Sequence, residues 1–308
     1  MRSWNDKNYK IGFPKAKGDV SNMGFPCYAD TKYDGELNFI IIKDGEMEMV
    51  NKDKYGRHRT DFPVIDELKI QDLPDNTILC GELYYGDNIY DFLRNRDNEN
   101  LQFAIFDMWE FKEIKDNYYI PKHKMSYQDR RQKLEETITD DEHIHLSEVS
   151  LVQSKHELER AKTTAINKGY EGIIAKISGS IWVDGDSKAW CKMKKEQTAD
   201  LVVIGYSRKA KHLSLHLGYK VNGKWVGLCG CGSGITFADK MIWKAKLEKD
   251  KLPNNKQIDK KNFLVEPKYV VEVSFQEITK INGLVSGLRH PVYKRFRDDK
   301  TIGEVSFK

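Results

Sequence analysis

The chain has 308 residues, of which 39% are hydrophobic and 32% are charged, with a formal net charge of +4. This composition excludes a disordered chain, and the length predicts two domains. The longest apolar runs fall far short of the roughly 20 residues of a membrane helix, and no apolar signal core opens the sequence, so we expect a cytoplasmic protein without a membrane partner.

The cysteines indicate the redox environment. Cys27, Cys80, Cys191, Cys229 and Cys231 are an odd set without CxxC spacing. Such a set is typical of reduced thiols in a cytosol-like compartment. It also argues against a zinc site.

Strands dominate the expected structure of the first half. Apolar residues from Leu37 to Val50 form two short segments, and Asp44-Gly45 between them is typical of a tight hairpin turn. Segments 77–85 and 101–109 are rich in aromatic and β-branched residues and are predicted to be strands. The hairpin therefore begins a few residues after Lys32.

A helix is predicted over residues 154–169. Ser154 and Glu157 have the spacing of a capping box, and Gly169 is a typical stop. One face of this helix carries Leu158, Ala161, Ala165 and Ile166. The helix leads into "EGIIAKI", residues 171–177, which is expected to be a short strand.

After Thr198 the pattern changes to about five strands with one helix. Thr236 and Asp239 can cap a helix over 237–249, and Asn222-Gly223 predicts a further hairpin. A small strand-rich unit with one helix fits an OB-type barrel, a fold that often binds nucleic acid. The expected domains are therefore residues 1–196 and 197–308.

Basic residues cluster at 190–196, 207–212 and 293–300. Such clusters suit a polyanionic partner. Any one of them taken alone fits a solvated surface equally well.

Three patterns are interpreted as structural. Residues 218–225, "GYKVNGKW", have the spacing of a phosphate-binding loop, but Trp225 replaces the Ser or Thr that would hold magnesium, so a hairpin is predicted. "GCGSG", residues 230–234, is expected to connect a strand to a helix. His143 and His145 are too few for a metal site and are expected in a surface loop.

Lys32 is the candidate nucleophile. It lies between an acidic residue and Asp34-Gly35. A free lysine amine is neutral in well under ~0.1% of molecules at pH 7, so nearby cations such as Lys192 and Lys194, or a bound metal, are expected to lower its pKa. Asp34 would oppose this effect if it lay close. Taken alone, the KxDG tetrapeptide is more often an ordinary turn.

Six segments that occur in a fixed order along the chain support a functional interpretation of Lys32. They are "KYDG" (32–35), "CGEL" (80–83), "FAIFDMW" (103–109), "EGIIAK" (171–176), "WCKMK" (190–194) and "LRHPVYKRFRDDK" (288–300). This set resembles the ATP-dependent DNA ligases, members of the covalent nucleotidyltransferases, from about Asp30 to Lys300. The C-terminal part is more similar to a DNA ligase barrel than to an RNA ligase or a capping enzyme.

The resemblance implies an α+β fold, with an adenylyltransferase domain of antiparallel sheets and flanking helices followed by the OB-fold barrel. It also implies three chemical steps. Lys32 attacks the α-phosphorus of ATP and forms lysyl-AMP, the AMP passes to the 5′-phosphate of a nick, and the 3′-hydroxyl displaces AMP. Positive charge on the protein would stabilise the transferring phosphate.

The resemblance also assigns roles to residues of this sequence. Glu82 would accept from the ribose hydroxyls, Phe106 would face adenine, and Glu171 with Glu82 would bind Mg²⁺ or Mn²⁺. Further nucleotide contacts fall on Asp30, Thr31, Lys52, Lys176, Lys192 and Lys194. Arg297, Asp299 and Lys300 of the second domain would reach the pyrophosphate only if the domains close.

Three arginines that the family usually carries are missing. Leu37, Lys52 and Asp186 stand in their places. Lysine does not reproduce a bidentate arginine contact, and leucine and aspartate supply no positive charge. Arg57 or Arg59 could compensate.

ATP is the expected cofactor, because 31 residues before Lys32 are too few for the extra domain of NAD-dependent ligases and no four-cysteine zinc site follows. A minimal ligase that clamps nicked duplex DNA as a monomer is expected, in a host-cell cytoplasm if the source is viral. Two alternatives stay open. One is an RNA ligase of the same superfamily, and the other is a non-catalytic protein that binds nicked DNA.

Overall fold

The computed structural model describes residues 10–51, 58–59, 62–86, 89–96, 98–209, 212–252, 262–281 and 284–307. The chain forms two compact units, Met1–Lys194 and Lys195–Lys308. Among the described helices, none is both long enough and apolar enough to span a membrane.

The first unit is built around a large, mostly antiparallel sheet. Its strands follow the order β5-β4-β3-β6-β7-β8, and β9 pairs in parallel with β7. They are β3 (Glu36–Lys43), β4 (Glu46–Asn51), β5 (His58–Arg59), β6 (Thr77–Tyr84), β7 (Gln102–Lys115), β8 (Tyr118–Pro121) and β9 (Ile144–Leu146).

The predicted hairpin is confirmed as β3 and β4. Asp44 and Gly45 both have positive φ angles, 55° and 76°, the backbone conformation of the tight turns that join such strands. The strand predicted at 77–85 is β6. The strand predicted at 101–109 is longer than expected, because β7 continues past its pairing with β6 to pair with β8.

A second, antiparallel sheet has the order β10-β2-β11-β13. Its strands are β2 (Cys27–Lys32), β10 (Val149–Val152), β11 (Gly172–Ile177) and β13 (Trp190–Lys194). The short strands β1 (Pro14–Ala16) and β12 (Gly185–Ser187) pair in parallel beside it. The sequence correctly predicts β11.

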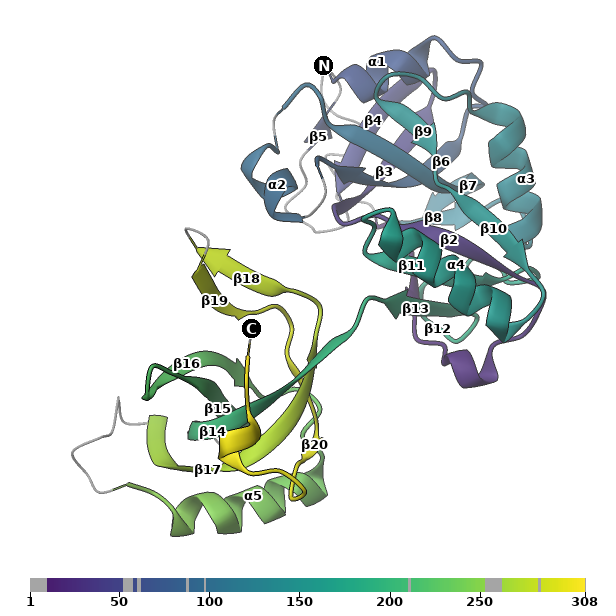
Figure 1. The fold of residues 1–308 in the computed structure, drawn as a ribbon. Helices are drawn as coiled ribbons and strands as arrows, with labels where there is room; N and C mark the ends of the chain where they lie inside the picture. Colours follow the sequence, from purple (N-terminus) through teal and green to yellow (C-terminus); the bar gives the residue numbers. More distant parts are fainter. Residues whose placement is uncertain are drawn as a thin grey trace. The chain divides into compact units, whose positions relative to one another are not determined.

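The predicted helix is α4 (Lys155–Asn167), which lies across the sheet containing β2 and β11 (Figure 1). Its apolar face joins the core of that sheet through Leu158 and Ala165. Half of the expected capping box forms. The Ser154 side chain accepts from the Glu157 N–H at 3.2 Å, while the Glu157 carboxylate accepts from the N–H of Gln153 instead of Ser154.

The other helices of this unit cover the large sheet and its edges. They are α1 (Pro63–Lys69), α2 (Ile89–Arg94) and α3 (Tyr127–Thr137), with a short 3₁₀ helix η1 (Val20–Asn22). Val64, Ile65 and Leu68 of α1 and Leu134 of α3 join the core of the large sheet. Burial of such side chains stabilises the unit by about 1.5–3 kcal/mol each.

The second unit is the strand-rich unit expected from the sequence. Its main sheet has the order β16-β15-β14-β17-β20, and β18 and β19 form a separate pair. The strands are β14 (Gln197–Lys209), β15 (His212–Val221), β16 (Lys224–Cys231), β17 (Asn262–Phe275), β18 (Ile278–Ile281), β19 (Leu284–Leu288) and β20 (Val292–Phe296). A short 3₁₀ helix, η3 (Ile302–Glu304), follows.

The predicted helix of this unit is confirmed as α5 (Phe237–Lys249), with a complete capping box between Thr236 and Asp239. It packs on the barrel core through Trp243 and Leu247. Asn222 and Gly223, with φ angles of 49° and 78°, form the turn between β15 and β16, so residues 218–225 are a hairpin as predicted.

Candidate active site

A cavity of about 240 Å³ lies within the first unit. Strands of both its sheets contribute side chains to the walls, and β1 adds Pro14, Lys15 and Ala16. Candidate residues from five separate segments line it: Asp30, Thr31, Lys32, Glu82, Phe106, Lys176 and Lys192. The fold thus gathers residues that lie up to 162 positions apart in the sequence.

Lys32 is the last residue of β2, and Glu171 holds its amine. The Lys32 Nζ donates to Glu171 Oε2, while the Glu171 backbone N–H donates to the Lys32 carbonyl at 3.1 Å. The other oxygen of Glu171 pairs with Lys194. Glu171 and Lys194 therefore join the cavity through this ion-pair network rather than by lining it.

The charge state of Lys32 differs from the expectation. Burial favours the neutral amine, but the carboxylates of Glu171 and Glu82, with a smaller effect of Asp34, outweigh burial and raise the pKa of Lys32 above its ordinary value. The prediction that Lys192 and Lys194 lower this pKa is wrong. The physical reason is that carboxylates, not cations, are the nearest groups.

Glu82 lies on β6, and its Oε1 accepts from the backbone N–H of Gly35 at 3.2 Å. A side chain at position 35 would collide with the Leu83 carbonyl oxygen, 2.2 Å from where a Cβ would stand, so only glycine fits here. Burial raises the pKa of Glu82 to about 7, although the charge of Lys32 opposes this shift.

This raised pKa predicts that Glu82→Gln changes how stability depends on pH. Between pH 4.5 and 7 the folded chain keeps a proton on Glu82 that the unfolded chain has released, so the free energy of unfolding falls as pH rises. A shift to about 7 corresponds to a loss of up to about 3 kcal/mol. Glutamine resembles the protonated acid and removes this dependence.

Urea unfolding of both proteins at pH 5 and pH 8 measures the effect, because every other titrating group is shared. The wild type should lose more stability than Glu82→Gln between the two pH values. An equal loss in the two proteins would show that Glu82 titrates normally.

Asp30 and Lys176 form a buried ion pair in the floor of the cavity. The Lys176 Nζ lies 2.5 Å from Asp30 Oδ2, and both side chains are only 2% exposed. Tyr127 and Ser147 donate their hydroxyls to Asp30 at 2.8 and 2.7 Å. Both oxygens of Asp30 are therefore engaged within the protein.

Aromatic rings surround the same lysine. The Lys176 Nζ lies 4.7, 4.4 and 4.5 Å from the ring centroids of Phe106, Tyr127 and Trp190. Such contacts stabilise a desolvated cation. Tyr127 and Trp190 were missed as site residues, because a lone tyrosine in a helix gives no signal. Trp190 could have been found from its place in "WCKMK".

The three positions where the family usually carries an arginine differ in their surroundings. Leu37 lines the cavity and pairs in register with Glu82. Asp186 pairs in register with Lys15, a cavity residue that the sequence did not single out. Lys15 thus brings a cation to the cavity near the position where an arginine is lost. Lys52 and Arg57 lie outside the described residues, and of Arg59 only the backbone is described.

The C-terminal candidates form their own cluster in the second unit. Arg297 donates from Nη1 to both oxygens of Asp200 at 2.8 and 3.0 Å, and from Nε and Nη2 to Asp299, both at 2.7 Å. Lys300 Nζ lies 2.5 Å from Asp200 Oδ2. Hydrogen bonds from Arg297 lower the pKa of Asp299 to about 2.

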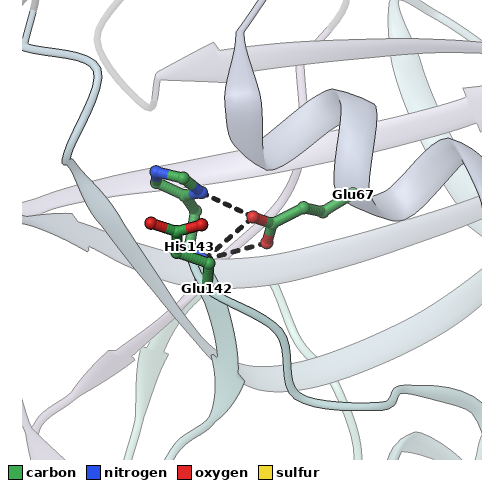
Figure 2. A group of neighbouring side chains, drawn as sticks. All are labelled: Glu67, Glu142 and His143. Atoms are coloured by element: carbon green, nitrogen blue, oxygen red, sulfur yellow. Dashed lines mark hydrogen bonds and ion pairs between the residues drawn. The ribbon is translucent and has the colours of Figure 1, made fainter.

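Glu67, Glu142 and His143 form a further group of potential metal ligands, with donor atoms within 4.8 Å of one another. Figure 2 shows that Glu67 already accepts from His143, through the backbone N–H at 2.9 and 3.1 Å and through the ring Nδ1 at 2.5 Å. The contact ties α1 to the start of β9. His145 lies within β9, so the expectation of a surface loop is wrong for this residue.

Comparison with protein families places these features in context. The family model "ATP dependent DNA ligase domain" matches residues 13–194, and "ATP dependent DNA ligase C terminal region" matches residues 208–300. The match to the second model agrees with the OB-type barrel expected after the first domain.

Individual relatives agree. The DNA ligase of Thermococcus fumicolans is 28% identical, covering 94% of this chain and 55% of the relative, and that of Enterobacteria phage T4 is 22% identical, covering 92% and 67%. The chain thus spans about half the length of the first of these relatives.

Solved structures share the fold. The structure named Pmar-Lig_Pre has a TM-score of 0.70 at 19% identity, covering 93% of this chain and 67% of that one. A structure described as "DNA binding with a minimal scaffold: Structure-function analysis of Lig E DNA ligases" has a TM-score of 0.56 at 17% identity, covering 93% and 99%. The resemblance carried by the six sequence segments is confirmed, and the chain belongs to the ATP-dependent DNA ligase family.

Proposed function

We propose that this protein is a DNA ligase that uses ATP to seal nicks with 3′-hydroxyl and 5′-phosphate ends in duplex DNA. The observation that carries the proposal is the position of Lys32, whose amine lies at a cavity lined by Glu82, Lys176 and Lys192 and is held by Glu171. A nucleophile, two carboxylates and several cations at one cavity suit nucleotidyl transfer to an amine.

Lys32 is the proposed nucleophile of the first step. Its amine nitrogen attacks the α-phosphorus of ATP, a phosphorus–nitrogen bond forms, and the bond to the pyrophosphate oxygen breaks. Lys32 must first lose a proton, and the carboxylate of Glu171 is the base in direct contact with it. Arginine could not act in this place, because its guanidinium stays protonated.

Glu171 and Glu82 suit a divalent cation. Each of these carboxylates raises the pKa of Lys32. Carboxylate oxygens are the ligands that Mg²⁺ and Mn²⁺ prefer. A bound ion supplies charge neutralisation on the phosphates.

The remaining candidates bind the nucleotide in this proposal. Phe106 faces the adenine, Glu82 accepts from the ribose, and Lys176 and Lys192 stabilise negative charge, with Lys194 acting beside them. Asp30 and Thr31 complete the cavity, and Lys52 is assigned from the sequence alone. Residues 1–196 form the nucleotide-binding domain and residues 197–308 the OB-fold domain.

The later steps involve the DNA. The AMP passes from Lys32 to the 5′-phosphate of the nick, and the 3′-hydroxyl then displaces AMP and closes the backbone. We assign Arg297, Asp299 and Lys300 to the pyrophosphate of the first step. The protein is expected to act as a monomer on nicked duplex DNA in the cytoplasm.

A sealing assay tests this function. The protein is incubated with ATP, Mg²⁺ and a labelled duplex that carries one nick with a 5′-phosphate, and the joined strand is measured on a denaturing gel. Sealing should require ATP and the 5′-phosphate. Faster sealing of a nick flanked by RNA would favour the RNA ligase, and binding of nicked DNA without sealing would favour the non-catalytic alternative.

A further inference from the structure

Asp200 on β14 holds two cations of the C-terminal cluster at once. Arg297 donates to both of its oxygens, at 2.8 and 3.0 Å, and the Lys300 amine lies 2.5 Å from one of them. The side chains of Asp200 and Arg297 are 19% and 12% exposed. Ion pairs with this degree of burial are stronger than pairs on an open surface.

The positive and negative charges within this cluster balance one another. The two positive charges of Arg297 and Lys300 face the two negative charges of Asp200 and Asp299. Because Asp299 binds Nε and Nη2 while Asp200 binds Nη1, all three nitrogens of the guanidinium already donate hydrogen bonds. A polyphosphate that approaches these cations therefore competes with both carboxylates.

The carboxylates of Asp200 and Asp299 differ in how freely they can move when a ligand approaches. Asp299 lies two residues from Arg297, is 52% exposed and can move with the loop that carries both. Asp200 belongs to another strand, 97 residues earlier, where it pairs in register with Glu272 of β17. The sheet fixes Asp200, so its negative charge stays beside Arg297 and Lys300 when an anionic ligand approaches.

We propose that Asp200 is an internal counter-anion that competes with pyrophosphate for Arg297 and Lys300, so that pyrophosphate formed in the first step is held weakly and leaves. This inference rests on the proposed function, because it assigns these cations to the pyrophosphate. Asp200 touches no reacting atom. It acts by holding the two cations, which separates its role from that of Lys32.

The reverse of the first step measures this competition. A pyrophosphate oxygen attacks the phosphorus of lysyl-AMP, the phosphorus–nitrogen bond breaks, Lys32 takes up a proton and ATP is formed. Wild-type and Asp200→Asn proteins are loaded with labelled AMP and exposed to increasing pyrophosphate. The readout is the pyrophosphate concentration that gives the half-maximal rate of AMP loss.

Asp200→Asn keeps an oxygen that accepts from Arg297 but removes the charge. The half-maximal concentration should fall about tenfold, the effect of weakening one charge-assisted hydrogen bond. Asp200→Ser is a second variant, expected to change in the same direction. Thermal melting of each variant checks its fold.

Glu272→Gln is the matched control. It removes the same charge from the neighbouring strand but frees Arg295, whose Nε lies 2.7 Å from Glu272. Its half-maximal concentration should stay within about twofold of wild type. An unchanged or higher concentration in folded Asp200→Asn, or an equal fall in both variants, would overturn the inference. Wild type that takes up no AMP from ATP would overturn the proposed function itself.

Discussion

Replacing Lys32 with arginine should reduce ATP-dependent nick sealing by more than about 10⁴-fold, the scale of loss seen when a nucleophile is removed. The same variant should seal a nick whose 5′-phosphate already carries AMP within about tenfold of the wild-type rate. Arginine keeps the positive charge that pairs with Glu171, so the carboxylate is not left unpartnered. It does not become a neutral nucleophile, because the guanidinium stays protonated.

Comparing sealing with ATP and sealing of the nick that already carries AMP distinguishes a chemical role of Lys32 from a structural one. Lys168→Arg is the matched control, since Lys168 pairs with Glu148 at 2.5 Å on the surface, 51% exposed, outside the cavity. It should retain both activities. If Lys32→Arg sealed nicks with ATP at the wild-type rate, Lys32 would not be the nucleophile. If a folded Lys32→Arg protein lost both activities equally, its role would be structural.

Asp30→Asn and Lys176→Met should each lower the free energy of unfolding by about 3–5 kcal/mol, because each leaves a buried charge without its partner. Both side chains are 2% exposed, and their charged atoms lie 2.5 Å apart. The double variant removes both charges. It should be more stable than the sum of the single losses predicts, with a coupling energy of about 2–3 kcal/mol.

Denaturant unfolding of the four proteins at pH 7 measures this coupling. The exposed pair of Glu148 and Lys168 is the control, with side chains 48% and 51% exposed. The double-mutant cycle of this pair, with Glu148→Gln and Lys168→Met, should give a coupling energy of less than about 1 kcal/mol. If the coupling energy of Asp30 and Lys176 were as small as that of the control pair, the buried pair would not stabilise the floor of the cavity.

Local features of the fold could be predicted from the sequence because neighbouring residues determine them. Asp44-Gly45 adopts the positive φ angles that these two residue types favour, and Thr236 caps α5 through Asp239, three residues away. The half-formed box at Ser154 shows the limit of this reasoning. The Glu157 carboxylate can accept from the backbone N–H of either Gln153 or Ser154, and the sequence does not predict which of them it uses.

The electrostatics of the site could not be predicted, because they depend on distances between remote residues. Glu171 lies 139 residues after Lys32, and the contact between them reverses the expected direction of the lysine pKa. Tyr127 and Ser147 reach Asp30 from α3 and from a loop. Asp200 meets Arg297 because β17 pairs with both β14 and β20, and Arg297 directly follows β20.

Intact-protein mass spectrometry after incubation with ATP and Mg²⁺ tests the central claim most directly. The protein is first treated with pyrophosphate to remove any AMP already bound, and its fold is checked. We expect wild type to gain the mass of one AMP, with the adduct mapped to Lys32, and Lys32→Arg to gain none. Folded wild type that gains no AMP, or an adduct on another residue, would contradict the claim.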